Sequence, residues 1–398
     1  MIRRNVFKAL GGVTIGTAVA ACRAPALRAP VPTPVLTTPA AIPTATPSVG
    51  EPANPNGLRV LADQRKFRLG SAFSNTLFKS DKREQFLEIY RRDFNLATLH
   101  SGFYWTAWEA ERGKISQYQV DEMKRQAEAL QEAGITDLRG HPLIFPTFEP
   151  DWLISGLKNG TIKKAQAIDI LTQHIRDVMT PFKGIIREWV VVNEPFRFYD
   201  ADRGDYFKLV IGEDYVDMAF KAARETDPQA KLMLNDYDTH AKSGRGNRYE
   251  SDKDPIKYNK VLIDRLKAQG LVDSIGTQMH ISAAKPPKVT DMIETWRSYG
   301  VPVHITELDI NLKDSSAITN RKRFEQQAQV YGTVMEAALQ SDVCASLCLW
   351  EFGDKYSWLE DPYFSFASPD ADATPWDDVL KPKPAYVAMQ QALQKMPS

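Results

Sequence analysis

Two glutamates lie where a reaction could use a pair of carboxyl groups. Glu194 follows an apolar run at 189–192, and Glu307 lies within another at 303–310. Hydrolysis of a glycosidic bond requires such a pair, because one group protonates the leaving oxygen while the other attacks the anomeric carbon or activates water. Retention of configuration needs about 5–5.5 Å between the carboxyl groups and inversion needs more, a distance that chain spacing does not supply. A single glutamate at a strand end is more often an ion-pair partner, so the pair needs support from its surroundings.

Eight short apolar runs alternate with longer amphipathic segments from residue 57 onward. The short runs predict buried strands, and apolar residues at three- and four-residue intervals predict helices such as 215–227 and 259–270. The predicted strands are FRLGSAF, FNLATLH, DLRGHPLIF, EWVVVNE, KLMLNDY, SIGTQMHI, VHITELDI and SLCLWEF. This alternation predicts the α/β class and a single (β/α)8 TIM barrel. A doubly wound open sheet is the alternative. It is weakened because no glycine-rich phosphate loop follows the first run.

Polar or aromatic residues occupy the ends of six of the eight predicted strands. They are His141, Asn193 and Glu194, Asn235 and Asp236, Gln278 and His280, Glu307 and Asp309, and Trp350. In such barrels the chemistry takes place at the C-terminal ends of the strands. Polar groups at the end of an apolar strand need a partner or a function, so the set predicts a polar, aromatic-lined cleft. The strands that carry Glu194 and Glu307, the fourth and the seventh, are expected to face each other.

The segments around the two glutamates resemble a known enzyme family. WVVVNEP at 189–195 and HITELDI at 304–310 are similar to motifs of the glycoside hydrolase family 10 xylanases. The resemblance continues, in the family's order, through RGHPLIF, EDYVDMAFKAARETDPQAKLMLNDYD, IGTQMHI and LWEFGDKYSWL. It implies retaining endo-hydrolysis of β-1,4-glycosidic bonds in xylan-type polysaccharide, without a cofactor. No metal is implied, and the histidines are too scattered to predict a metal site.

The resemblance also implies roles for individual residues. Glu194 matches the general acid/base and Glu307 matches the nucleophile. Asn193 matches the residue that binds the 2-hydroxyl of the sugar being cleaved, His280 matches the histidine that orients the nucleophile, and Gln278 matches its neighbour in the cleft. In this mechanism Glu307 must stay ionised, which requires donors such as His280. Glu194 must hold a proton near neutral pH, which requires a drier site or a nearby negative charge.

Four further residues match substrate-binding positions of the family. His141 matches a sugar-binding histidine on the third strand. Trp350 and Trp358 match aromatics that wall the non-reducing side of the cleft, and Trp105 is the one family residue kept in its stretch of the chain. Because family members tend to have a cis peptide after this histidine, and cis costs least before proline, we expect the His141–Pro142 bond to be cis.

The second predicted strand departs from the family pattern. Family members usually carry a Glu-Asn pair and then a Lys to bind two sugars upstream of the cut, whereas this chain has His100, Ser101 and Tyr104. Phe145 and Pro146 replace a Trp-His pair on the same side. A site built to hydrogen-bond hydroxyl groups discriminates strongly through those contacts. Two alternatives therefore stand beside xylan hydrolysis: the same chemistry on another β-1,4-glycan, and a non-catalytic carbohydrate-binding surface lipoprotein.

The first 56 residues have the composition of a targeting segment and a spacer. Arg3 and Arg4 precede a short apolar, uncharged stretch, which predicts a signal peptide at 1–21 of the twin-arginine kind. The stretch ends Val-Ala-Ala-Cys, which predicts a lipid anchor on Cys22. Residues 22–56 are rich in Pro, Thr and Ala and predict a disordered linker ahead of the catalytic domain at 57–398. We expect an exported lipoprotein tethered to a membrane, with plain secretion as the alternative.

Charge and cysteine content exclude several other classes. Lys plus Arg and Asp plus Glu both number 50, so the net charge is zero and a nucleic-acid partner has little electrostatic support. Three cysteines suggest no disulfide framework, and Cys344 and Cys348 are interpreted as small buried residues. The expected partners are a polysaccharide and, through Cys22, a membrane, and the chain is expected to be a monomer.

Overall fold

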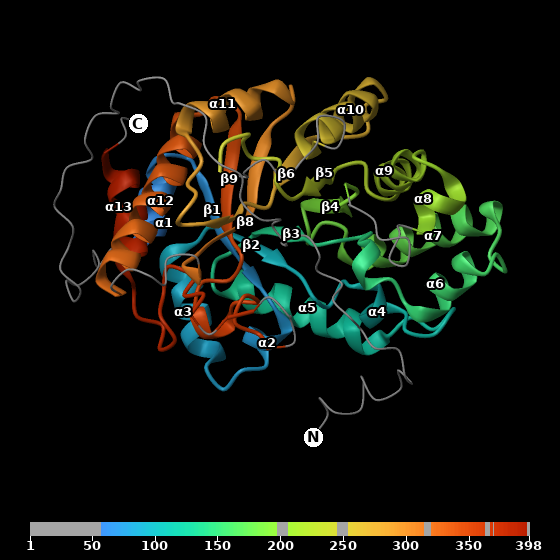
Figure 1. Cartoon of the computed structure of the whole chain (residues 1–398). Coiled ribbons are helices and arrows are strands. Elements are labelled where there is room, and N and C mark those ends of the chain that lie inside the picture. Colours follow the sequence, from blue (N-terminus) through green and yellow to red (C-terminus); the bar gives the residue numbers. More distant parts are fainter. Residues whose placement is uncertain are drawn as a thin grey trace.

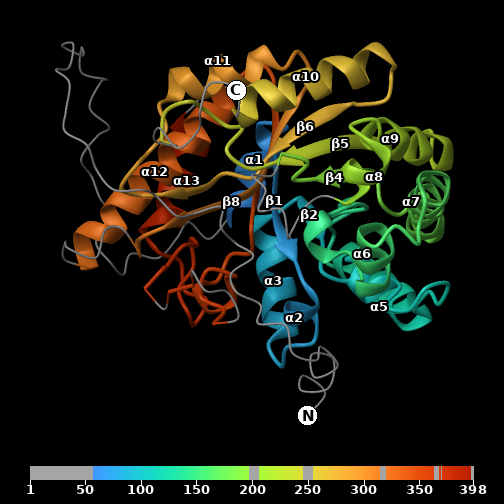
Figure 2. The same ribbon diagram turned by 45° about the vertical axis from the view of Figure 1, so that its right-hand side comes forward.

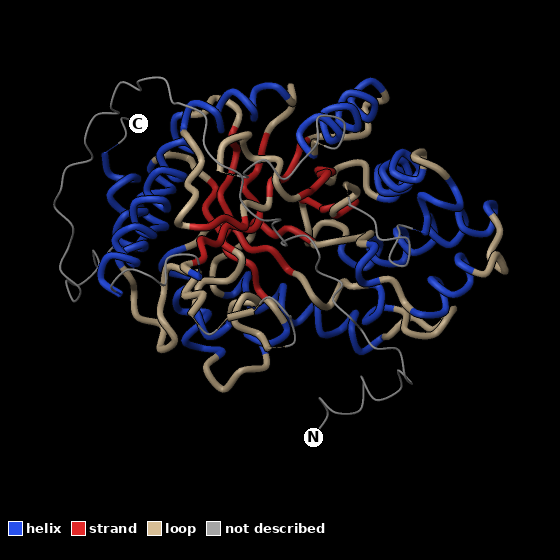
Figure 3. Tube along the Cα trace, in the orientation of Figure 1, coloured by secondary structure: helices blue, strands red, loops and turns tan. Residues whose placement is uncertain are grey.

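The computed structural model describes residues 57–196, 206–244, 254–313, 320–362, 367–368 and 370–395. Parallel strands occupy the centre of the molecule, and helices surround them (Figure 1, Figure 3). The predicted signal peptide, the linker and Cys22 lie outside the described residues.

The strands form a closed parallel barrel. They are β1 (Arg68–Phe73), β2 (Leu96–Leu99), β3 (Asp137–Gly140), β4 (Glu188–Asn193), β5 (Lys231–Asp236), β6 (Ser274–Thr277), β7 (His280–Ser282), β8 (Val303–Asn311) and β9 (Cys344–Leu349). Their order is β6-β5-β4-β3-β2-β1-β9-β8-β7, and an additional pairing of β6 with β8 closes the ring. Since β7 follows β6 after two residues and pairs with β8 as well, the two strands share one position in the ring. The predicted (β/α)8 barrel is confirmed.

Helices between successive strands form the outer layer. They are α1 (Gly57–Gln64), α2 (Asn75–Phe78), α3 (Arg83–Asp93), α4 (Trp105–Trp108), α5 (Gln117–Glu132), α6 (Asp151–Lys158), α7 (Lys164–Met179), α8 (Tyr206–Ile211), α9 (Tyr215–Thr226), α10 (Pro255–Ala268), α11 (Val289–Ser298), α12 (Asn320–Gln340) and α13 (Pro384–Lys395). Short 3-10 turns occur at η3 (Pro146–Phe148), η4 (Thr180–Phe182) and η6 (Asp354–Tyr356). Figure 2 shows α5, α6, α7 and α9 along one side of the barrel, and α12 and α13 along the other. The helices predicted at 215–227 and 259–270 are confirmed as α9 and α10.

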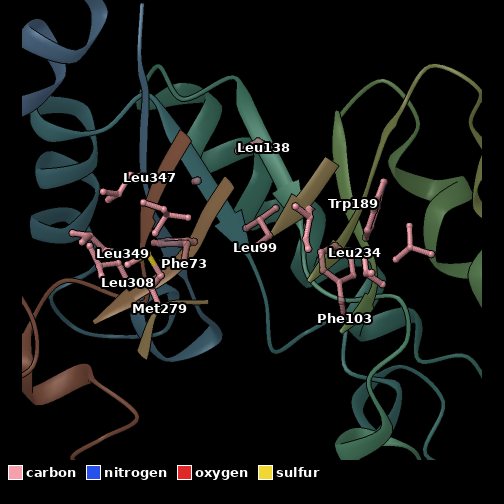
Figure 4. Packing of buried hydrophobic residues seen from close by; sticks show 14 of the residues in the cluster. Phe73, Leu99, Phe103, Leu138, Trp189, Leu234, Met279, Leu308, Leu347 and Leu349 are labelled. Carbon is pink, nitrogen blue, oxygen red and sulfur yellow. The ribbon is translucent and has the colours of Figure 1, made fainter. Parts of the chain in front are cut away.

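The core follows from strands that are buried on both faces. Every residue of β4 is buried, as expected for a parallel strand with side chains both inside the barrel and under the helices. Apolar side chains from different strands, such as Leu99 of β2, Leu138 of β3 and Leu234 of β5, belong to one buried cluster (Figure 4). Cys344 and Cys348 are buried and free, as their apolar setting predicts.

Two predicted strands end differently from expectation. β3 ends at Gly140, and the His141–Pro142 bond that follows is cis, as predicted. Beyond it, the Ile144 N–H donates to the Val191 carbonyl over 3.0 Å, so this segment still follows β4. The run at 274–281 is divided into β6 and β7 because Met279 has a left-handed backbone, with φ of 59°.

The ring order also corrects the expected placement of the two glutamates. β4 and β8 are separated by β5 and β6 alone, so the strands that carry Glu194 and Glu307 are not opposite each other. The strand diametrically opposite β4 is β9. The shorter arc allows Asn235 of β5 and Gln278, which follows β6, to bridge the two glutamates.

A charged layer fills the barrel interior toward the N-terminal ends of the strands. Arg139 is fully buried, and its Nε donates to Glu188 Oε2 over 2.6 Å, while its Nη2 donates to Ser346 Oγ over 3.2 Å. Arg68 and His304 lie 3.4 and 3.5 Å from the same carboxylate. Burial opposes ionisation here, but Arg139, His304 and Arg68 together hold the pKa of Glu188 well below its usual range. The carboxylate is therefore the common partner of this layer.

Glu188→Ala is expected to lower the free energy of unfolding by about 3–5 kcal/mol, because it leaves the buried guanidinium of Arg139 without its carboxylate. Denaturant unfolding of the purified protein measures this. Glu111→Ala, which removes an exposed carboxylate paired with Lys114, is the matched control and should leave stability unchanged. A Glu188→Ala protein as stable as the control would contradict the role given to this layer.

Candidate active site

Glu307 is held by donors from neighbouring strands. The pairing of β8 with β9 shifts register between Ile305 and Leu308, and such irregularities re-aim side chains next to active sites. The Glu307 carboxylate is buried, Oε1 accepts from Asn235 Nδ2 over 2.6 Å, and Oε2 lies 3.2 Å from His280 Nε2. His141 Nδ1 lies 3.9 Å from Oε1. Three side chains from β5, β7 and the end of β3 therefore surround this carboxylate.

His280 lies between two carboxylates and is the group that sets their charge. β7 pairs with β8 so that His280 is opposite Asp309, and His280 Nδ1 lies 2.7 Å from Asp309 Oδ2. Burial lowers the pKa of His280, but Asp309 and Glu307 outweigh it and raise the pKa to about 10. The imidazolium then donates to both carboxylates. Burial raises the pKa of Glu307, yet the His280 imidazolium and the Asn235 amide that donate to it bring this pKa below its usual value, so Glu307 is ionised.

His280→Gln is expected to move the acid limb of the pH–kcat/KM profile to higher pH. The amide can still donate to Glu307 but carries no charge, so the pKa of Glu307 rises and its ionised fraction falls on the acid side. In the unchanged protein the imidazolium persists up to its pKa of about 10, so this pair does not set the alkaline limb. Initial rates across the pH range measure the shift, and an acid limb that stays in place would show that His280 does not control Glu307.

Glu194 follows β4 in an unusual backbone conformation. Its φ is 54°, a left-handed value that non-glycine residues adopt at a cost and that recurs at functional sites. Its N–H donates to the Asn235 carbonyl over 2.8 Å, and its Oε1 accepts from Gln278 Nε2 over 3.2 Å. Burial and the negative charge of Glu194 raise the pKa of Asp236 well above its usual value. Glu194 is half-buried, and its carboxylate lies near enough to that of Asp236 to affect its pKa.

A chain of hydrogen bonds joins the two glutamates. Asn235 Nδ2, which donates to Glu307, also donates to Asn193 Oδ1 over 2.7 Å. Gln278 Nε2, which donates to Glu194, also donates to Asn193 Oδ1 over 3.3 Å. Asn193 and Asn235 are register partners in β4 and β5, which places their side chains together. The chain runs from Glu307 to Glu194 within the part of the barrel between β4 and β8, so their relative position is fixed by strands.

Aromatic side chains lie next to this chain on the side of β9. The Trp350 ring centroid lies 5.1 Å from that of His141, and the Trp358 centroid lies 4.8 Å from that of His280. Trp358 Nε1 donates to Asp309 Oδ2 over 2.8 Å, which ties this half-buried ring to the carboxylate that also pairs with His280. Burial lowers the pKa of His141 to about 4, so this histidine is neutral at neutral pH.

The sequence of this chain matches a known protein family over most of its length. The model of glycosyl hydrolase family 10 matches residues 57–392. The chain belongs to glycosyl hydrolase family 10. Endo-1,4-beta-xylanase B of Thermotoga neapolitana is 27% identical over 342 residues, 85% of this chain and 92% of that relative. Endo-1,4-beta-xylanase A of Phanerodontia chrysosporium is 32% identical over 295 residues, 74% of this chain and 66% of that relative.

Solved structures show the same barrel. Xylanase 10B from Thermotoga maritima superposes with a TM-score of 0.73 at 27% identity, covering 85% of this chain and 98% of that one. Xylanase 10B from Thermotoga petrophila RKU-1, solved in complex with xylobiose, also gives 0.73 at 27% identity, covering 87% and 99%. The similarity thus extends over nearly the whole described part of this family 10 member.

Trp105 lies in a different setting from the one predicted for it. Its indole is 3% exposed and stacks on the His174 ring, with centroids 3.6 Å apart and an angle of 7° between the planes. Its Nε1 donates to Glu109 Oε2 over 3.0 Å. The ring is therefore engaged with α7 and with Phe207 of α8, whose centroid lies 5.9 Å away, and its polar atom with Glu109, which follows α4. This geometry does not favour the predicted sugar contact, and we assign Trp105 to the core.

For other residues of this family 10 site, the sequence alone predicted no specific role. Asn235 and Asp309 are polar strand-end residues, but their contacts with Glu307 and His280 depend on strand register. Glu351 lies directly after Trp350 and could have been found by the same strand-end criterion, since it extends the polar set by one residue. Its partner is His100, one of the residues that depart from the family pattern.

Proposed function

We propose that this chain hydrolyses internal β-1,4 bonds of xylan with retention of configuration, using Glu307 as the nucleophile and Glu194 as the acid/base. Family membership supports the reaction class. The observation that carries the assignment of residues is the hydrogen-bond chain from Glu307 through Asn235, Asn193 and Gln278 to Glu194. It couples one carboxylate that is ionised to another that is half-buried beside Asp236.

The reaction proceeds in two displacements. Glu307 attacks the anomeric carbon and forms a glycosyl ester, while Glu194 protonates the departing glycosidic oxygen. Formation of the ester removes the negative charge of Glu307, which leaves Glu194 as the ionised member of the pair. Glu194 then takes a proton from water, the water attacks the same carbon, and Glu307 is released as a carboxylate.

The surrounding side chains bind and orient the sugar. Asn193 Oδ1 accepts from the side chains of Asn235 and Gln278. This directs the Asn193 Nδ2 group toward the substrate and suits it to bind the sugar 2-hydroxyl. Neutral His141, 3.9 Å from Glu307, binds a neighbouring hydroxyl. The rings of Trp350 and Trp358 provide apolar surface against the sugar on the side of β9.

A reducing-sugar assay on xylan, cellulose and mannan tests this proposal, with the anomeric configuration of the first product followed by NMR. We expect xylan to be hydrolysed, and the first-formed product to have the β configuration. Faster hydrolysis of cellulose or mannan would favour the related reading that His100, Ser101 and Tyr104 adapt the site to another β-1,4-glycan. Binding without hydrolysis of any of the three would favour a carbohydrate-binding protein.

The same proposal includes export and attachment to a membrane. Arg3 and Arg4, the apolar stretch and Cys22 support a processed, lipid-modified N-terminus, with residues 22–56 as the spacer and the barrel as a monomer. No helix in the described ranges is long and apolar enough to span a membrane. The mass of the N-terminal peptide of the exported protein tests the anchor, since an unmodified N-terminus at any residue other than Cys22 would contradict it.

A further inference from the structure

A second polar pair lies on the same face of the barrel, across from Glu194. His100 follows β2 and Glu351 follows β9, the strand opposite β4. The side chains of both residues are 9% exposed, and His100 Nε2 lies 3.7 Å from Glu351 Oε1. This distance is too long for a hydrogen bond, and His100 Nε2 is buried without a hydrogen-bond partner among the described residues. Such an unpaired donor is costly unless a ligand satisfies it.

The backbone conformation of Glu351 indicates a functional role for its carboxylate. Its φ is 65°, in the left-handed region that favours glycine. A glutamate in this conformation is strained, and strained non-glycine residues cluster where a ligand is bound. Glu194 has the same kind of backbone at the opposite strand end, with φ of 54°.

Tyr104 defines which nitrogen of His100 carries the proton. The Tyr104 hydroxyl lies 3.5 Å from His100 Nδ1, and its ring stacks on Phe148 with centroids 4.0 Å apart. Burial and the negative charges of Glu307, Glu351 and Glu194 raise the pKa of Tyr104, so its hydroxyl stays protonated. Donation from this hydroxyl to Nδ1 leaves the proton of His100 on Nε2, which faces Glu351.

The pair is continuous with the catalytic centre. The His100 ring lies against Trp350, with centroids 4.7 Å apart, and Trp350 in turn contacts His141. His141 lies 3.9 Å from Glu307. Since Glu194 protonates the leaving oxygen and follows β4, the side of β2 and β9 receives the part of the glycan that stays on Glu307.

We propose that His100 and Glu351 together bind one unsubstituted hydroxyl of the glycan on the side that stays on Glu307. This rests on the proposed function of the two glutamates. An oxygen that bridges these two atoms, about 2.8 Å from each, must accept from His100 and donate to Glu351. A hydroxyl does both. Ether and ester oxygens only accept, and a carboxylate would also be repelled by Glu351, so decoration of this hydroxyl is excluded.

Aryl xylobiosides test the pair, either unsubstituted or O-methylated at each hydroxyl in turn. For one of these positions, methylation should lower kcat/KM of the wild type roughly tenfold or more, because a site built to bind a hydroxyl rejects its loss. Glu351→Gly should lower kcat/KM on the unsubstituted substrate by a similar factor while leaving that methylated one nearly unchanged. The penalty for methylating the hydroxyl bound by Asn193 should stay the same, which makes it the internal control.

Thermal unfolding separates binding from a structural role. Glycine suits a φ of 65°, so the Glu351→Gly protein should unfold at the same temperature as the wild type or higher. His100→Ala should remove the same discrimination, and the double variant should lose no more than the worse single variant, as expected for two groups on one hydroxyl. A lower unfolding temperature with equal loss on every substrate would assign Glu351 to the fold instead.

The outcome for the pair can be told apart from that for the proposed function. If the wild type hydrolyses none of the xylobiosides, the assignment of Glu194 and Glu307 fails, and calorimetric binding of the same compounds still tests His100 and Glu351. Another outcome is that hydrolysis or binding occurs while every methylation lowers kcat/KM or affinity as much in Glu351→Gly as in the wild type. In that case the pair does not bind a hydroxyl. Glu111→Gln, which changes an exposed carboxylate, is the matched variant for both measurements.

Discussion

Glu307→Ala is expected to abolish most of the hydrolysis of xylan, with kcat/KM falling roughly 10⁴-fold or more, as for the loss of other covalent nucleophiles. The alanine cannot form the glycosyl ester, and the imidazolium of His280 loses one of its two carboxylates. Glu307→Gln is the companion variant, because its amide keeps the volume and still cannot attack. Both should be measured by initial rates on xylan together with thermal unfolding, and Glu111→Ala should hydrolyse xylan like the wild type.

Added azide tests whether the carboxylate removed in Glu307→Ala is the nucleophile. A small anion can occupy the space beside the anomeric carbon in Glu307→Ala and attack an aryl xylobioside from the face that Glu307 used. Because this is a single displacement, the glycosyl azide should have the inverted, α configuration. A β product, or a rate on xylan within tenfold of the wild type, would contradict the assignment of Glu307 as nucleophile.

Much of this site could be predicted because it depends on strand ends. Glu307, His280 and Asp309 belong to runs whose apolar pattern identifies them as strands, and parallel strands bring their C-terminal ends to one face. The pairing of His280 with Asp309 could not be predicted, because it depends on the register of β7 against β8. Asn235 is a similar case. Thr306 Oγ1 donates to its Oδ1 over 2.7 Å, which directs its Nδ2 to Glu307, and no pattern along one strand shows that contact.

Features that depend on neighbours across the chain were harder to predict. Trp105 was expected to contact sugar, but whether a tryptophan is a binding surface or part of the core depends on what covers it, here His174 of α7. Arg139 lies in a predicted strand, yet the pattern does not show that it points into the barrel to meet Glu188. The left-handed backbone of Glu351 has no signal in its residue type, since glutamate rarely adopts it.

Glu194→Ala is expected to lower kcat/KM on xylan by about 10²–10⁴-fold, the usual contribution of a positioned general acid or base. The size of the loss should depend on the leaving group. A xylan chain leaves as a strongly basic alkoxide unless it is protonated, whereas an aryl group with an acidic phenol leaves without help. Initial rates on xylan and on a series of aryl xylobiosides measure this dependence, which should be much steeper in Glu194→Ala than in the wild type.

The second displacement then becomes the slow step on activated substrates. Water attacks the ester on Glu307 without a base, so the variant should show a burst of phenol followed by slow turnover, and intact-protein mass should increase by one xylobiosyl unit. Azide needs no deprotonation, so it should restore turnover and give a β-glycosyl azide, since Glu307 still forms the intermediate. This outcome is the opposite of the α product expected for Glu307→Ala. An α azide from Glu194→Ala, or no trapped ester, would exclude the division of roles between the two glutamates, which the chain through Asn235, Asn193 and Gln278 holds in one arrangement.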